Sequence, residues 1–298
     1  MGHHHHISGR NLGFTVLLNV LITLSQIIGG IWSGSLALLS DAAHNFSDVL
    51  ALVISYAANK LSTGKKQNIR QTYGYKRAEI IAAFINASTL FVVAFYLIVE
   101  SVKRFFQPEE IQAGIVIWLA ALSIVANGLS VLLLHKDARN NLNIKSAYIH
   151  LFTDMLTSIA VLIGGLLMKY KSLYGVDTII SLIIAVYLIF IAYKLWKEAF
   201  EILMQFAPGN IDLGEINKEL KNISGVKNVH HIHIWRLNEH EIHFEAHMAL
   251  EGDIKISEFD KICEKAEKLL REKFGVTHTN IQPEFDRKEP HLYIIQDD

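Results

Sequence analysis

The feature that most restricts the fold of this chain is a series of six long apolar stretches in its N-terminal two thirds. They are Leu12–Trp32, Leu36–Ala58, Ala78–Val102, Ile111–Leu134, Ile144–Met168 and Val176–Trp196. Each is close to the roughly 20 residues that a helix needs to cross the hydrocarbon core of a bilayer. Because the stretches lack the long polar face of a helix in a soluble bundle, the sequence predicts an α-helical membrane protein with six transmembrane helices.

Composition excludes several classes of protein. Apolar residues make up 51% of the 298 residues and charged residues 19%, which is too apolar for a typical soluble protein. The formal net charge of −1 leaves no basic excess to neutralise phosphates, so nucleic acid is not an expected partner. Cys263 is the one cysteine, which excludes an intrachain disulfide and a thiolate zinc cluster. Residues 1–9 read as an expression tag, and their histidines are not metal candidates.

Basic residues in the loops predict the orientation in the membrane. One side carries Lys60, Lys65, Lys66, Arg70, Lys76, Arg77, Lys136, Arg139 and Lys145. The other side carries Lys103, Arg104, Lys169 and Lys171. Because short cytoplasmic loops carry the excess of Lys and Arg, we expect both termini to face the cytoplasm.

A change to charged composition after the last apolar stretch marks a second domain. We expect a membrane domain at 10–208 and a cytoplasmic domain at 209–298. The tail pattern predicts a helix at Glu215–Ile223, strands at Val226–Arg236 and Glu241–Leu250, a helix at Glu258–Phe274 and a strand at His278–Phe285. This order is typical of a small ferredoxin-like α+β sheet that helices cover on one face.

Strict alternation along the two predicted strands assigns the tail histidines to faces of the sheet. On the second strand His247 lies opposite the apolar face. On the first strand His230 shares a face with Ile232 and Ile234, while His231 points the other way.

Polar residues inside the apolar stretches indicate the chemistry. His44 and Asp48 lie in the second stretch, His150 and Asp154 in the fifth, and each i, i+4 pair occupies one helical face. An ionised carboxylate in mid-membrane persists only with a partner or a function, and no Lys or Arg lies at a similar depth. Two imidazoles and two carboxylates suit tetrahedral zinc or cobalt better than magnesium or calcium. Asp41, one turn earlier, either lines the access path or caps the helix.

Through these residues the chain resembles the cation diffusion facilitator family, in its zinc, cobalt and cadmium branch. The matching segments are Ser40–Asp48, His150-x-x-x-Asp154, Tyr73–Glu79 and Val229–Trp235. The resemblance implies a homodimer in a bacterial inner membrane. It also implies that zinc leaves the cytoplasm by alternating access, in exchange for protons.

The resemblance further implies a metal site in the tail, formed by His230, His247 and Glu284, although solvated histidines are the simpler reading. Gln282 stands where some relatives place another histidine. Some relatives also bind metal between the second and third helices through Asp and His. The segment Ser62–Arg77 offers amides, phenols and cations there instead, so we expect no metal site in it.

Two other classes of function compete with transport. A zinc enzyme within the bilayer would need an open coordination position and a general base, and the chain has neither His-Glu-x-x-His nor a Ser/His dyad. A passive metal channel would need several weak sites along a pore, whereas the intramembrane ligands are concentrated in one place. Metal flux without hydrolysis would favour the transporter.

Overall fold

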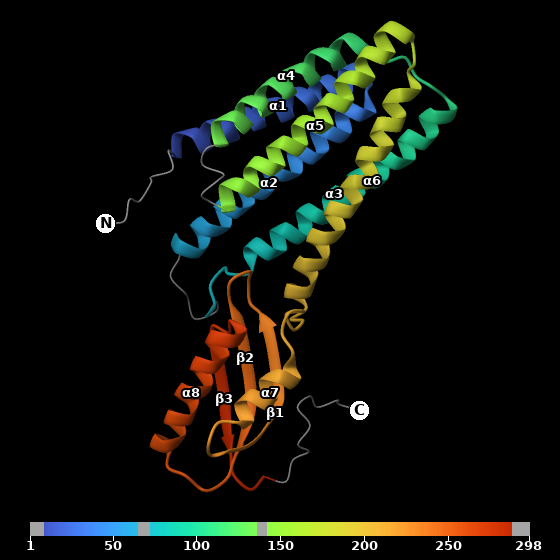
Figure 1. Cartoon of the computed structure of the whole chain (residues 1–298). Coiled ribbons are helices and arrows are strands. Elements are labelled where there is room, and N and C mark those ends of the chain that lie inside the picture. Colours follow the sequence, from blue (N-terminus) through green and yellow to red (C-terminus); the bar gives the residue numbers. More distant parts are fainter. Residues whose placement is uncertain (1–8, 65–71, 136–141, 288–298) are drawn as a thin grey trace. The chain divides into compact units, whose positions relative to one another are not determined.

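The computed structural model describes residues 9–64, 72–135 and 142–287, which contain six long helices followed by an α+β unit (Figure 1). The helices are α1 (Gly9–Ser33), α2 (Leu36–Gly64), α3 (Ala78–Phe106), α4 (Ala113–Leu134), α5 (Leu142–Lys171) and α6 (Gly175–Leu203). By contacts the chain divides into two compact units, residues 1–57 with 82–196, and residues 58–81 with 197–298.

Four of the six helices, α3 to α6, are long and apolar enough in their described residues to cross a membrane. The described part of α1 adds a shorter apolar run, Leu17–Ser33. Of the six transmembrane helices that the sequence predicts, four are therefore long and apolar enough in their described residues to span a membrane.

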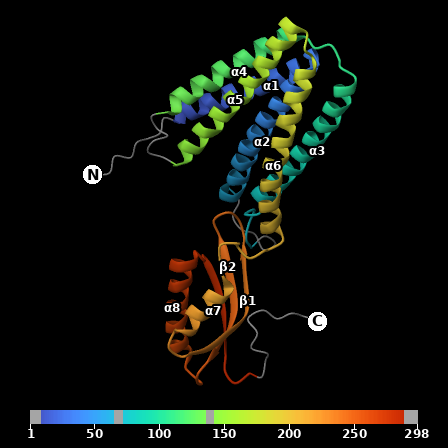
Figure 2. The same ribbon diagram turned by 45° about the vertical axis from the view of Figure 1, so that its right-hand side comes forward.

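Helix α4 packs along α5 on one side and α1 on the other (Figures 1 and 2). Small residues allow this close approach. A Cβ atom added at Gly29 of α1 would lie 1.9 Å from Leu119 Cδ1 of α4. One added at Gly165 of α5 would lie 2.9 Å from Ile117 Cγ1. A hydroxyl pair, Ser123 with Ser158 at 2.8 Å, also joins α4 to α5.

The start of α2 is fixed by a carboxylate from α6. Asp177 is 1% exposed and accepts hydrogen bonds from the hydroxyl of Ser35 at 2.5 Å and from the backbone N–H of Leu36 at 2.8 Å. A carboxylate at this position satisfies N–H groups that have no partner within the helix and complements the helix dipole. Because α2 carries His44 and Asp48, this cap helps to position the intramembrane ligands.

The C-terminal unit folds in the order α7 (Leu213–Lys221), β1 (Val226–Arg236), β2 (Ile242–Leu250), α8 (Ile256–Phe274) and β3 (His278–Glu284). The element order matches the prediction, and the bounds differ by at most two residues. Strand β2 is central, antiparallel to β1 and parallel to β3.

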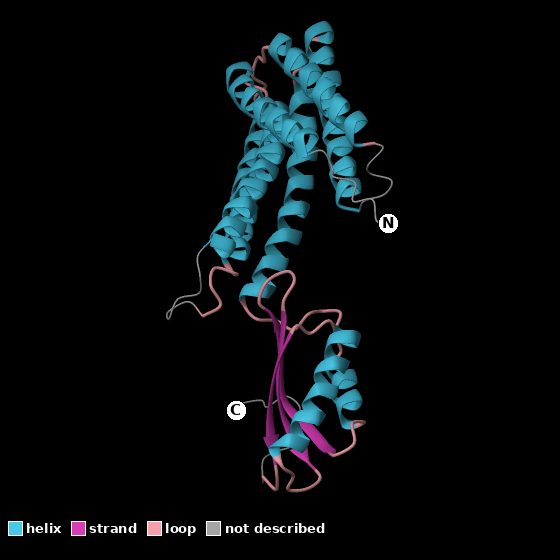
Figure 3. Cartoon of the chain, turned by 90° about the vertical axis from the view of Figure 1, so that its left-hand side faces the viewer, coloured by secondary structure: helices cyan, strands magenta, loops and turns pink. Residues whose placement is uncertain are grey.

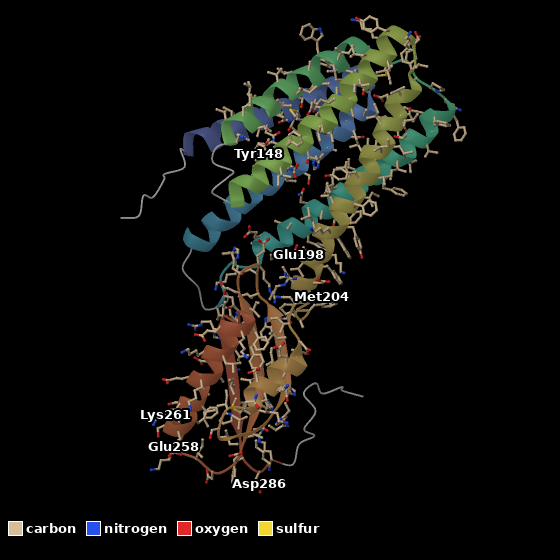
Figure 4. The ribbon with its side chains drawn as sticks, in the orientation of Figure 1. Tyr148, Glu198, Met204, Glu258, Lys261 and Asp286 are labelled. Carbon is tan, nitrogen blue, oxygen red and sulfur yellow. The ribbon has the colours of Figure 1, made fainter. Side chains whose placement is uncertain are left out.

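Helices α7 and α8 lie on one side of this three-stranded sheet (Figure 3). Their buried residues Ile216 and Leu270 belong to the same apolar core as Phe244 of β2. The charged residues Glu258 and Lys261 of α8 are exposed (Figure 4). The other face of the sheet, which neither helix covers, carries the histidines.

Strand β1 pairs with β2 with two register shifts, between Val226 and Asn228 and between His230 and His233, and they change which face its histidines occupy. His230 pairs directly with His247, and the register then shifts before the ladder resumes. At the shift His231 has a φ of 51°, the left-handed conformation that one class of bulge uses. Ile232 and Ile234 lie in the apolar core, whereas His230 lies on the face of His247. The prediction that His230 shares a face with the two isoleucines is wrong, because strict alternation does not survive a bulge.

Candidate metal centre

Helices α2 and α5 bring their two i, i+4 pairs together. His44 Nε2 lies 3.4 Å from Asp154 Oδ1, and His150 Nε2 lies 3.2 Å from Asp48 Oδ2. Within α5, His150 Nε2 is 3.5 Å from Asp154 Oδ2. Among the described residues, the two histidines are the ion-pair partners recorded for these carboxylates. The group is thus a compact cluster of two imidazoles and two carboxylates.

The donor atoms fit a metal better than they fit one another. Both ring nitrogens of His44, both carboxylate oxygens of Asp154 and Oδ2 of Asp48 are buried without a hydrogen-bond partner in the described part of the chain. Buried polar atoms in proteins are normally hydrogen-bonded, so such a concentration of unsatisfied donors and acceptors indicates a missing ligand. Imidazole nitrogen and carboxylate oxygen are both ligands of zinc.

The ring of His44 lies between the two carboxylates. Its Nδ1 is 3.7 Å from Asp48 Oδ2, while its Nε2 is the atom near Asp154. Atoms of His44, His150 and Asp154 lie within 4.8 Å of one another. These three residues could each give one atom to the same metal ion. Asp48 lies near the other ring nitrogen of His44, and one imidazole binds one ion through one nitrogen. Asp48 could therefore join the other three only after a side-chain rotation.

The cluster is open on one side. The side chains of His44 and Asp154 are 5% and 0% exposed, whereas those of Asp48 and His150 are 32% and 37% exposed. Asp48 is the member nearer the C-terminal end of α2, and His150 the member nearer the N-terminal end of α5. The accessible side therefore faces the end of the bundle where α2 ends and α5 begins.

Asp41 supports the cluster from one turn away. Its carboxylate accepts hydrogen bonds from Gln26 Nε2 of α1 at 2.6 Å and from Thr157 and Ser158 of α5 at 2.8 and 3.2 Å. It is 1% exposed, and Asp177 caps α2 instead. Asp41 therefore does not cap α2, and its hydrogen bonds join α1, α2 and α5 beside the ligands.

Sequence reasoning missed three neighbours of this site. Gln26 is fully buried in α1 and accepts a hydrogen bond from Asn45 at 3.0 Å. Tyr187 of α6 contacts the ring of His44 edge-on, with the ring centroids 6.1 Å apart. A buried amide inside an apolar stretch was the available signal for Gln26, because such groups are costly in a membrane. No sequence spacing relates Tyr187 to His44.

A second cluster lies on the open face of the C-terminal sheet, with one residue from each strand. Glu284 Oε2 is 3.1 Å from His230 Nε2, and Glu284 Oε1 is 2.8 Å from His247 Nδ1. The side chains of His230 and Glu284 are almost fully buried, and that of His247 is 17% exposed. Arg287 also pairs with Glu284 at 3.0 Å, and the ring of His231 stacks on His247.

The segment from Ser62 to Arg77 is partly described. Residues 65–71 lie outside the described residues, so the expectation of no metal site there stays a prediction. Tyr73 meets the ring of His243, and Lys76 Nζ lies 2.6 Å from Glu241 Oε2.

Comparisons with known proteins complete these observations. Residues 14–204 match a family described as "Cation efflux transmembrane domain", and residues 208–286 match "Cation efflux protein, cytoplasmic domain". A "Cadmium, cobalt and zinc/H(+)-K(+) antiporter" of Bacillus velezensis is 35% identical over 95% of this chain and 92% of its own length. The "Metal cation efflux system protein CzcD" of Cupriavidus metallidurans is 31% identical over 94% and 89%.

Two further similarities concern a zinc transporter and a solved domain. "Zinc transporter ZitB" of Escherichia coli is 31% identical over 88% of this chain and 83% of its own length. The solved "Metal-bound C-terminal domain of the CzcD transporter" from the Cupriavidus species is 30% identical, covers 25% of this chain and 99% of that domain, and has a TM-score of 0.23.

Proposed function

The chain belongs to the cation efflux family, and we propose that it exports zinc, with cobalt and cadmium as further substrates, from the cytoplasm in exchange for protons. Members of this family are membrane transporters and not enzymes, and the four apolar helices make the chain an integral membrane protein. The antiporter and zinc-transporter relatives support this choice of substrates and of proton exchange.

One observation carries the proposal: two i, i+4 pairs of histidine and aspartate converge between α2 and α5. We assign His44, Asp48, His150 and Asp154 as the transport site. Intramembrane carboxylates that have no Lys or Arg at ion-pair distance among the described residues need a cation, and a divalent metal supplies it. Two nitrogen ligands favour zinc and cobalt over magnesium and calcium.

The same four residues couple metal release to protons. Imidazole and carboxylate must be deprotonated to bind a metal, so protons compete directly with zinc for the site. A site exposed to a more acidic compartment releases metal and takes up protons. Alternating access follows if the metal-bound and proton-bound forms favour different conformations. The exposed side chains of Asp48 and His150 support assigning this structure to the inward-open state, with α2 ending and α5 beginning at the cytoplasmic side.

The rest of the chain fits the proposed topology. All six helices span the inner membrane, both termini are cytoplasmic, residues 10–208 form the transport domain and residues 209–298 the cytoplasmic domain. We assign the latter to the ferredoxin-like arrangement without its first strand. Two copies form a homodimer, which the family's cytoplasmic domain supports. His230, His247 and Glu284 hold a regulatory zinc ion in this domain.

Transport in proteoliposomes tests the proposal. Purified protein is reconstituted with a zinc-sensitive dye inside the vesicles, and zinc entry is measured with the lumen acidic and with no pH gradient. We expect flux that rises with the gradient and acidification of the outer medium as zinc enters. Zinc flux that is indifferent to the pH gradient would remove proton exchange from the proposal, and absence of flux with intact folded protein would remove transport.

A further inference from the structure

A pocket of about 290 Å³ lies at the start of α3, outside both metal clusters. Its walls include Lys76 and Arg77, the aromatic rings of Tyr73 and Trp235, and the amide of Gln205. All of these residues belong to one compact unit of the chain, residues 58–81 with 197–298. Neither the transport site nor the zinc site of the tail accounts for this pocket.

The pocket carries more positive charge than the described residues compensate. Lys76 is paired with Glu241, which leaves Arg77 as the second cation. Arg77 Nε is buried and has no hydrogen-bond partner among the described residues. A buried guanidinium N–H without an acceptor is costly, so an acceptor from outside the described chain is expected.

The neighbouring His243 shows the same excess of positive charge. Burial lowers the pKa of His243, and the charges of His278, Lys76 and Arg77 lower it further. Glu241 opposes this effect but does not reverse it. An anion in the pocket would relieve the repulsion among these groups.

The chemistry of the walls selects the kind of anion. The planar guanidinium of Arg77 matches the oxygens of a phosphate group, and Lys76 adds a second charge beside it. Arg77 immediately precedes α3, a helix apolar enough to cross the membrane, so the pocket lies where that helix leaves the hydrocarbon. Tyr and Trp are enriched at this depth. We propose that the pocket binds an anionic phosphate group, carried by a phospholipid headgroup or by free phosphate.

Binding to the full-length protein tests this proposal. The protein in detergent is mixed with equal amounts of phosphatidylcholine and phosphatidylglycerol, and the retained lipids are counted by native mass spectrometry. A parallel arm measures binding of radiolabelled inorganic phosphate in phosphatidylcholine nanodiscs. Both arms compare the natural sequence with Arg77→Gln, which removes the cation, and with Gln205→Glu, which places a negative charge in the wall.

Two matched controls accompany these variants. Lys103→Gln removes an exposed cation from the other end of α3, and Gln205→Asn changes the side chain without adding charge. Gln205 is exposed and has a φ of 58°, which Asn also tolerates, so the Gln205 pair stays informative if Arg77→Gln does not fold.

The expected result is a tenfold to hundredfold loss of binding, as order of magnitude, in Arg77→Gln and Gln205→Glu, with both controls unchanged. Loss of phosphatidylglycerol retention identifies a lipid headgroup as the source, and loss of phosphate binding alone identifies free phosphate. Retention of both ligands at equal levels in all variants overturns the proposal. An equal loss in Lys103→Gln also overturns it, because binding would then follow net charge and not the pocket.

Discussion

His230 Nε2 lies 3.1 Å from Glu284 Oε2, although the two residues belong to strands separated by β2. His247 of β2 lies between them and is 2.8 Å from the other oxygen of the same carboxylate. His230 pairs directly with His247, between the two register shifts of β1. The irregular pairing of β1 with β2 therefore places His230 on the face that carries the other two residues of the cluster.

The first prediction concerns the carboxylates of the transport site. Asp48→Asn and Asp154→Asn should each abolish zinc flux, because an amide supplies no charge to a divalent ion. Size is nearly unchanged in both variants, so the folded protein should still be recovered. Flux is measured in proteoliposomes, with Asp253→Asn, an exposed position in the tail, as the control. Near-normal flux in both site variants would remove these residues from the site.

The sequence was sufficient to place this site on two helices, and the reason is physical. An ionisable residue is so costly in an apolar segment that its presence alone indicates function, and i, i+4 spacing defines its face. The element order of the tail followed from alternation and helical periodicity in the same way. Both signals are local, and they need no knowledge of which helices or strands meet.

What the sequence could not supply depends on distant contacts. Tyr187 reaches His44 because α6 packs near α2, and no local pattern encodes that packing. The bulge at His231 was missed because histidine in the left-handed conformation has no strong signature, unlike glycine. Asp41 was noticed, but its partners Gln26 and Thr157 come from two other helices.

Metal selectivity is the second prediction. His44→Asp replaces an imidazole nitrogen with oxygen, so discrimination between zinc and cadmium should relax, with cadmium gaining on zinc. We expect the zinc-to-cadmium flux ratio to fall, measured with each ion under the same pH gradient. His135→Asn, which removes an exposed histidine after α4, should leave the ratio unchanged. An unaltered ratio in His44→Asp would mean that another ligand sets selectivity.

The third prediction concerns Asp41 as a residue that positions the ligands. In the natural protein, Gln26 and Ser158 donate hydrogen bonds to a carboxylate oxygen of Asp41. Asp41→Asn replaces one carboxylate oxygen with an NH₂ group, which is itself a donor, so at least one of the donors around Asp41 loses its acceptor. A buried donor without a partner costs about 1–3 kcal/mol, and the thermal unfolding midpoint should fall accordingly. The KM for zinc should rise, because α1, α2 and α5 are no longer held together beside the site. An unchanged midpoint with normal KM would show that the network does not position the ligands.

The fourth prediction is a pH dependence that arises from His243. Burial, followed by the charges of His278, Lys76 and Arg77, lowers the pKa of this histidine in the folded protein. The unfolded chain then binds the proton more tightly, so the stability contributed by neutral His243 is present above about pH 6.5 and is lost as pH falls through the folded pKa. The drop in unfolding midpoint between pH 7.5 and pH 5.5 should be smaller in His243→Gln than in the natural sequence. Equal drops in the two proteins would contradict this assignment.

The last prediction concerns the tail as a cytoplasmic zinc sensor. Residues 209–298 contain their own apolar core, which α7, α8 and the sheet share, so this fragment should fold without the membrane helices. Its cluster offers three ligands, and zinc commonly takes four, which leaves one position for a water molecule or for the second copy. Zinc bound between two copies would strengthen the dimer and bias the attached helices toward one access state, because a ligand shifts an equilibrium by its differential affinity.

Analytical ultracentrifugation of the fragment should therefore show dimer affinity that rises with zinc. His247→Ala should eliminate that rise, whereas His240→Ala, an exposed position between β1 and β2, should retain it. Dimerisation that is equally tight with and without zinc would make the domain a constitutive clamp and not a sensor.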